Sequence, residues 1–119
     1  MTTDAFAPEP TPAQTREARV LIPQVPTRFD KVAGRRVPSV DLNPAARYGE
    51  FTELSVDGGI EELRSRFAVE ARANDYILCV GDVVMVAAAI SYACDAFGKA
   101  RLLRWDKNRK TYDTMEVEL

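Results

Sequence analysis

Histidine is absent from this chain of 119 residues, which has only two cysteines and one tryptophan. Without an imidazole the chain lacks the commonest general base, the usual zinc ligand and every histidine-activated nucleophile. The net charge of −2 provides no global basic field, so any contact with nucleic acid must come from a local patch. We therefore expect a protein that is not an enzyme and has no cofactor or metal ion.

The two cysteines, Cys79 and Cys94, both lie inside apolar runs, and neither belongs to a C-x-x-C pair. This placement predicts buried free thiols in a reducing compartment. A disulfide between a strand and a helix is the alternative, and the intact mass with and without reductant distinguishes the two.

Three prolines, Pro8, Pro10 and Pro12, interrupt the start of the chain, which also lacks the basic and apolar regions of a signal peptide. Prolines oppose helices and strand ladders, and little apolar surface is present to offset the entropy of ordering. We predict a disordered tail over residues 1–15, with docking to a partner as the alternative. A single domain is expected over residues 16–119, since 46% apolar residues can supply one core.

The remaining chain alternates apolar segments of strand and helix length. The expected elements are an edge strand at 19–25, a hairpin at 27–42, a short helix at 43–49, a strand at 50–56, a helix at 60–73, a central strand at 76–80, a helix at 83–97 and a terminal hairpin with strands at 101–105 and 111–119. Such an order implies at least three parallel strands and an antiparallel last strand. The predicted fold is a small mixed-sheet α/β domain, with a β-α-β-α-β-β core preceded by a β-hairpin and a short helix.

Local signals support several of these boundaries. Pro23 interrupts the first apolar run, which favours an edge strand over a central one. Gly34 supplies the positive φ of a hairpin turn, and Asn43 is suited to cap the short helix. Glu62 and Arg66 stand in the favourable order for an i,i+4 ion pair on the next helix.

The segment over residues 77–94 carries one charge and reaches the roughly 18 residues that a membrane span needs. Its Gly81-Asp82 pair divides it, so a strand and a helix are favoured and no membrane contact is expected.

Asp82 and Gly98 are suited to cap the helix over residues 83–97, which has almost no polar face. A helix that is apolar on all sides must be covered on all sides. We expect a homodimer or a wrap by residues 19–48 to cover it.

The Gly81-Asp82 turn joins a strand to a helix N-terminus, where backbone N–H groups can hold an anion or a nucleotide. No glycine-rich phosphate motif surrounds it, and the carboxylate of Asp82 would repel a phosphate, so a plain helix cap is favoured. A hydrolase built on carboxylates at strand ends is a further alternative, although their spacing matches no known pattern. Those carboxylates belong to Asp57, Asp75, Asp82 and Asp106.

The terminal hairpin is basic, because six cations against one carboxylate leave +5 between Lys99 and Tyr112. Cations with interleaved aromatics suit phosphate contact and base stacking. The residues that would contact nucleic acid are Arg101, Arg104, Trp105, Lys107, Arg109, Lys110 and Tyr112. Asp113, Glu116 and Glu118 follow on the partner strand, and we favour a hairpin in which they pair with these cations.

Four segments carry a resemblance: V-L-I-P-Q-V-P-T-R-F-D, V-P-S-V-D-L-N-P-A-A-R-Y-G-E, D-Y-I-L-C-V-G-D and L-L-R-W-D-K-N-R-K-T-Y. Over residues 19–119 the chain resembles a group of small proteins of tailed bacteriophages with no assigned activity. The resemblance implies a viral origin and expression in the host cytoplasm. The leading hypothesis is a binding or regulatory protein that acts on a host or phage macromolecule, for example as an inhibitor of a host complex. Nucleic-acid binding by the basic hairpin, and anion or nucleotide binding at Gly81-Asp82, are the alternatives.

Overall fold

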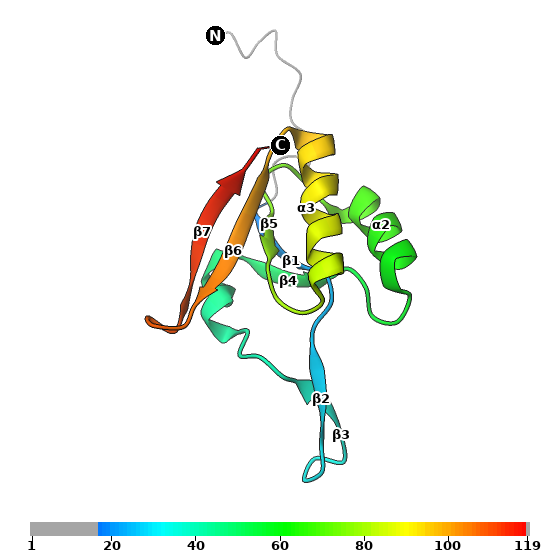
Figure 1. Ribbon diagram of the computed structural model, residues 1–119, viewed down its shortest axis with the longest axis vertical. Helices are drawn as coiled ribbons and strands as arrows, with labels where there is room; N and C mark the ends of the chain where they lie inside the picture. The colour runs from blue at the N-terminus through cyan, green and yellow to red at the C-terminus, as the bar shows by residue number, and fades with distance from the viewer. Residues whose placement is uncertain (1–16, 119) are drawn as a thin grey trace, which may run out of the picture.

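A five-stranded sheet with the order β4-β1-β5-β6-β7 organises the fold (Figure 1). The computed structural model describes residues 17–118, and the tail expected over residues 1–15 lies outside them. The elements are β1 (Arg19–Ile22), β2 (Thr27–Asp30), β3 (Arg35–Pro38), the 3-10 helix η2 (Asn43–Tyr48), β4 (Glu50–Glu53), α2 (Gly59–Glu70), β5 (Tyr76–Leu78), α3 (Val83–Phe97), β6 (Ala100–Asp106) and β7 (Thr111–Val117). β4, β1, β5 and β6 run parallel, and β7 is antiparallel to β6. The predicted mixed α/β fold with its early hairpin is therefore confirmed.

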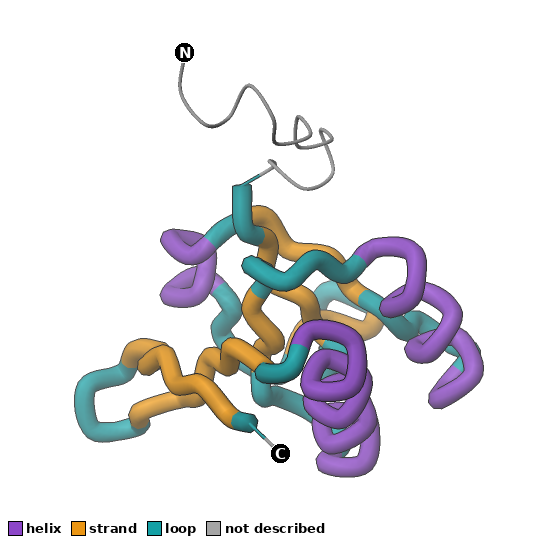
Figure 2. The backbone as a smooth tube through the Cα atoms, turned by 90° about the horizontal axis from the view of Figure 1, so that it is seen from above, coloured by secondary structure: helices purple, strands orange, loops and turns teal. Residues whose placement is uncertain are grey.

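Each face of the sheet has its own apolar core, because side chains alternate along a strand. On β1, Leu21 joins the cluster beneath α2 and α3, whereas Val20 and Ile22 join the cluster beneath η2. Figure 2 shows the two α-helices and η2 on opposite sides of the strands. β5 is the middle strand, and Ile77 and Leu78 divide between the two cores in the same way.

β1 lies inside the sheet, between β4 and β5, so the prediction of an edge strand at residues 19–25 is wrong. Pro23 misleads because the strand ends at Ile22, one residue before it. The proline therefore withholds no N–H group from the ladder, and its carbonyl accepts a hydrogen bond from the Ser55 N–H at 3.0 Å. At the start of the strand, Arg19 ties β1 to α2 through an ion pair with Glu70 at 3.1 Å.

Two local details also differ from expectation. Asn43 is the first residue of η2 rather than its cap, and its N–H donates to the carboxylate of Asp41. Glu62 does not pair with Arg66, because its carboxylate accepts N–H groups from the loop before α2. The carboxylates of Asp41 and Glu62 therefore accept backbone N–H groups close to the start of a helix.

Both ends of α3 follow local sequence signals, as predicted. Asp82 caps its first turn, and Gly98 ends it in the left-handed conformation with a φ of 82°. Gly98 carries no Cβ, so this conformation costs it little. Within residues 17–118 the structure contains no helix that is both long and apolar enough to span a membrane.

The expected wrap of α3 by residues 19–48 does not occur. Val83 and Val84 are 77% and 61% exposed, and exposed Ala87, Ser91 and Asp95 extend this stripe along the helix. The stripe consists mostly of small or polar side chains, so that leaving it in water exposes little apolar surface. The homodimer stays a prediction, which sedimentation at micromolar concentration tests.

Candidate functional site

Residues 27–38 form a hairpin that projects from the end of the main sheet, and we call this hairpin the arm (Figure 1). Its two strands pair antiparallel, with Thr27 opposite Pro38 and Asp30 opposite Arg35. The turn is closed by the Gly34 N–H, which donates to the Asp30 carbonyl at 2.8 Å, and Gly34 takes a φ of 70°. The predicted turn at this glycine is therefore confirmed.

The arm meets the body only at its base, where Thr27, Arg36 and Pro38 line a groove together with residues of the body. Every residue from 27 to 38 is exposed except Asp30 and Val37, which are half-buried. Phe29 is 56% exposed and Val32, at the tip, is 99% exposed. None of these twelve residues, all of which the structure describes, belongs to either apolar core. The arm is therefore an appendage of the fold and contributes no side chain to its apolar cores.

Positive charge is concentrated on the arm, although the whole chain carries −2. Four cations against the carboxylate of Asp30 leave a net charge of +3. These cations are Arg28, Lys31, Arg35 and Arg36. Across residues 17–118 none of the four forms an ion pair. The sequence pattern predicts the hairpin but assigns it no function, and this local excess of cations is the signal that marks it.

The carboxylate of Asp30 reduces the charge of the arm to +3 and also holds its turn. Its Oδ1 accepts the N–H groups of Val32 at 2.9 Å and Ala33 at 3.4 Å. Arg36 is held by Thr27, whose hydroxyl and carbonyl accept from the guanidinium at 2.8 and 2.9 Å. Side-chain hydrogen bonds thus stiffen the arm and leave its positive charge uncompensated.

In the basic hairpin formed by β6 and β7, two of the six cations of residues 99–112 form ion pairs within the described part of the chain, which is part of the pairing favoured from the sequence. Arg109 contacts Asp106 at 2.9 Å and Asp113 at 3.2 Å, and Lys99 contacts Glu116 at 3.1 Å. The hydrogen bond from the Arg109 side chain holds the pKa of Asp106 below its usual value. Opposite charges on this hairpin therefore cancel much of its expected field.

Three of the residues proposed there for nucleic-acid contact also contact other parts of the fold. Arg101 stacks on the ring of Tyr76 at 4.1 Å and donates to the Asn74 carbonyl at 2.7 Å. Tyr112 is 1% exposed, its ring lies against Trp105, and its hydroxyl donates to the Asp41 carbonyl. Burial raises the pKa of Tyr112, and the charge of Asp41 adds to the effect. Arg109 is the third, because it forms ion pairs with Asp106 and Asp113.

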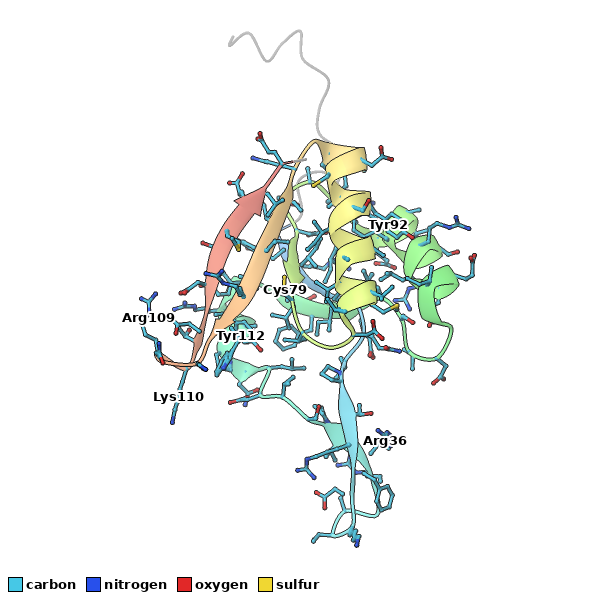
Figure 3. All side chains as sticks on the ribbon, viewed as in Figure 1. Arg36, Cys79, Tyr92, Arg109, Lys110 and Tyr112 are labelled. Carbon is cyan, nitrogen blue, oxygen red and sulfur yellow. The ribbon has the colours of Figure 1, made fainter. Side chains whose placement is uncertain are left out.

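The other four proposed residues are exposed but do not share one face. Lys107 and Lys110 lie in the turn and form no ion pair within residues 17–118, and Figure 3 shows Lys110 pointing away from the body. Trp105, at 39% exposed, and Arg104 are neighbours on β6 and so point to opposite faces. The structure does not gather these side chains into one binding surface.

At the Gly81-Asp82 turn, the carboxylate of Asp82 occupies the helix N-terminus. Its Oδ1 accepts the N–H groups of Val84 at 2.7 Å and Met85 at 3.4 Å, which confirms the predicted cap. Gly81 has a φ of 89°, and a Cβ there would lie 2.8 Å from the Gln24 carbonyl oxygen. These N–H groups therefore already have an acceptor. The anion or nucleotide site stays a prediction.

Most carboxylates considered for hydrolysis hold backbone in place. Asp75 accepts the N–H groups of Arg19 at 2.9 Å and Arg72 at 2.8 Å, and Asp106 accepts that of Asn108 at 3.0 Å. Asp57 is exposed in the loop before α2. Among residues 17–118, no three histidine, cysteine, aspartate or glutamate side chains are grouped so as to hold a metal ion.

The cysteines are free and half-buried, so they are less buried than expected. Burial raises the pKa of Cys79, and the charge of Arg104 opposes this only in part. The thiol of Cys79 is therefore protonated at neutral pH, which makes it a poor nucleophile. Cys94 donates a long hydrogen bond of 3.6 Å to the Val117 carbonyl.

Comparison with known proteins identifies a viral family. No curated protein and no solved structure matches the chain. The family model described as Phage Pam3 gp32-like protein matches residues 18–119, a range that contains the arm as well as the main sheet. Its description names a phage and no reaction. The match confirms the phage resemblance noted in the sequence, and the chain belongs to the Phage Pam3 gp32-like protein family.

Proposed function

We propose that this phage protein is a non-enzymatic binding or regulatory protein, that it acts on a host or phage macromolecule in the host cytoplasm, and that the arm is its contact element. The observation that carries the proposal is the arm itself, a projecting hairpin with four unpaired cations and no share in either core. An inhibitor of a host complex is one form that such a protein takes.

The composition of the arm supports binding over a role in stability. A lone two-stranded hairpin is marginally stable in water, and clustered like charges weaken it further. Phe29 and Val32 expose apolar surface beside those charges and gain nothing for the fold. Projecting loops and hairpins held by a rigid scaffold are where binding residues concentrate. A partner that buries Phe29 and neutralises the cations would account for both features.

The carboxylates and thiols support the non-enzymatic part of the proposal. Asp75, Asp82 and Asp106 have their oxygens engaged by backbone N–H groups. Cys79 has a raised pKa, which is opposite to the shift that activates a nucleophile. These groups are therefore assigned to the architecture of the fold.

Nucleic-acid binding through the C-terminal hairpin is kept as a second candidate. It is favoured by the exposure of Trp105 together with Lys107 and Lys110, which lie without ion pairs in the part of the chain that the structure describes. Residues 99–118 carry a net charge of +2, against +3 on the arm, so we place this hairpin second.

The test removes the arm without disturbing the sheet. Thr27 and Pro38 face each other, and the Ser39 N–H donates to the Pro26 carbonyl at 2.8 Å, so the two ends of the arm are adjacent. An armless variant therefore replaces residues 27–38 with Asn-Gly, a pair that closes a two-residue hairpin turn and keeps the hydrogen bond from the Ser39 N–H to the Pro26 carbonyl. The control variant carries Lys107→Gln with Lys110→Gln at the other hairpin.

Tagged wild-type, armless and control proteins are used to capture partners from a lysate of phage-infected cells. We expect wild-type and control proteins to recover the same macromolecule in stoichiometric amount, and the armless variant to lose it. Equal recovery with the armless variant contradicts the role of the arm. Recovery of nothing by the wild-type protein contradicts the proposed function.

A further inference from the structure

The cations of the arm surround it instead of lining one side. Residues opposite each other in an antiparallel pair share a face, and neighbours along a strand alternate. Arg28 and Arg35, which face Val37 and Asp30, therefore lie on one face of the arm. Phe29 and Arg36 face each other and lie on the opposite face. Lys31 is in the turn between the strands, so both faces and the tip carry positive charge.

Each of these cations is free to contact an anion. Arg35 lies directly opposite Asp30, whose Oδ1 accepts N–H groups of the turn, and within residues 17–118 Arg35 makes no ion pair. Arg36 uses its Nε and one terminal nitrogen on Thr27, which leaves further N–H groups of the guanidinium for a ligand. The bonds to Thr27 fix the orientation of this side chain, so little entropy is lost when it binds.

The distribution of charge selects between two kinds of polyanion. An acidic protein surface would meet one face of the arm and leave the opposite cations in water. A groove of duplex nucleic acid has phosphates along both walls, and the major groove of DNA admits a two-stranded β-ribbon. Arg is also the side chain best suited to bidentate contact with phosphate.

We propose that the arm inserts into a groove of duplex nucleic acid, with Arg28 and Arg35 toward one phosphate backbone and Arg36 toward the other. This inference rests on the proposed function and names the class of partner. Phe29 and Val32 then lie near the sugars and base edges, where they leave water. The rest of the chain carries −5 against +3 on the arm, so the body is repelled and the arm alone approaches the duplex.

The experiment measures binding of the full-length protein to a short fluorescein-labelled DNA duplex by fluorescence anisotropy, between about 50 and about 200 mM NaCl. Each phosphate contact contributes about −0.9 to the slope of log K against log salt, so four cations predict a slope between about −3 and −4. Arg28→Gln with Arg35→Gln should reduce the slope by about 2 and weaken binding about tenfold or more. Lys107→Gln with Lys110→Gln removes the same charge elsewhere and should leave the slope unchanged.

Thermal unfolding of each variant shows that it is folded before binding is compared. The proposal is overturned if the wild-type protein fails to bind the duplex at about 50 mM salt. It is also overturned if the Lys107 and Lys110 variant loses binding while the arginine variant keeps it. Equal affinity for the single strand excludes insertion into a groove.

The outcome of the lysate capture separates this inference from the proposed function. If a protein is recovered in an arm-dependent manner and the duplex is not bound, the nucleic-acid inference is wrong and the proposed function stands. If neither the duplex nor any lysate component depends on the arm, both are wrong.

Discussion

Glu62 closes the start of α2 with its own side chain. Its Oε1 accepts N–H groups from Val56 at 2.7 Å, Asp57 at 3.2 Å and Gly58 at 2.9 Å. The hydrogen bonds from Gly58 and Val56 hold the pKa of Glu62 below its usual value. A single carboxylate thus orders the loop between β4 and α2, a role that the sequence spacing to Arg66 does not reveal.

Because the folded-state pKa of Glu62 is lowered, its contribution to stability is present above the unfolded-state pKa and is lost as the pH falls through the folded value. We predict that Glu62→Gln lowers the melting temperature at about pH 7 and that the difference from wild type shrinks as the pH falls below about 4.5. Melting followed by circular dichroism over this range provides the measurement.

Glu61→Gln is the matched control, since the ion pair of Glu61 within residues 17–118 is with Arg64 and its side chain is 78% exposed. Exposed ion pairs contribute little to stability, so this change should be nearly neutral throughout this pH range. A pH-independent loss in Glu62→Gln would contradict the assignment of the effect to the Glu62 charge.

Asp82 offers a second test at the residue scale. Asp82→Ala leaves the N–H groups of Val84 and Met85 without their acceptor, which should cost about 1 kcal/mol of unfolding free energy. Asp82→Asn should restore most of the loss, because asparagine caps helices about as well as aspartate. Urea unfolding measures both variants. A variant with alanine that is as stable as wild type would show that the cap is not needed.

At the scale of elements, short-range signals predicted most of the fold. Asp82 and Gly98 mark the ends of α3 by chemistry that acts within one turn, and the structure places both ends there. The position of β1 could not be predicted in the same way, because strand order depends on packing between residues far apart in the chain. Pro23 was informative about where β1 ends, not about which strands flank it.

The candidate site was predictable only in part. Gly34 and the flanking residues predict a hairpin, and the structure contains it. Whether the hairpin packs on the body depends on tertiary structure. From the sequence, Phe29, Val32 and Val37 suggest that it does, because apolar residues usually face a core. The role of Arg101 in the terminal hairpin could not be predicted from the sequence either, because its stacking on Tyr76 follows from the pairing of β5 with β6.

The armless variant also makes a prediction about stability. Since residues 27–38 belong to neither core, their replacement should change the free energy of unfolding by less than about 1 kcal/mol. Urea unfolding of the wild-type and armless proteins measures this difference. A loss of several kcal/mol would show that the arm packs against the body in solution and that its exposure in the structure is not its working state.

At the scale of the whole molecule, the sheet and helices form a body that presents two hairpins. The arm carries Arg36, and the β6-β7 turn carries Arg109 and Lys110 (Figure 3). Carboxylates cancel the charge of Arg109 but not that of the arm cations. The molecule therefore combines a net charge of −2 with one concentrated basic projection, which is suited to a polyanionic partner.

We expect the arm, and no other part of the molecule, to contact the partner. The most direct measurement is a titration of the isotope-labelled full-length protein with the DNA duplex, followed residue by residue through its backbone amide NMR signals. We predict shifts that saturate together and are confined to residues 27–38 and their immediate flanks. Shifts centred on residues 101–112 or on Gly81 and Asp82, with the arm unperturbed, would contradict this expectation.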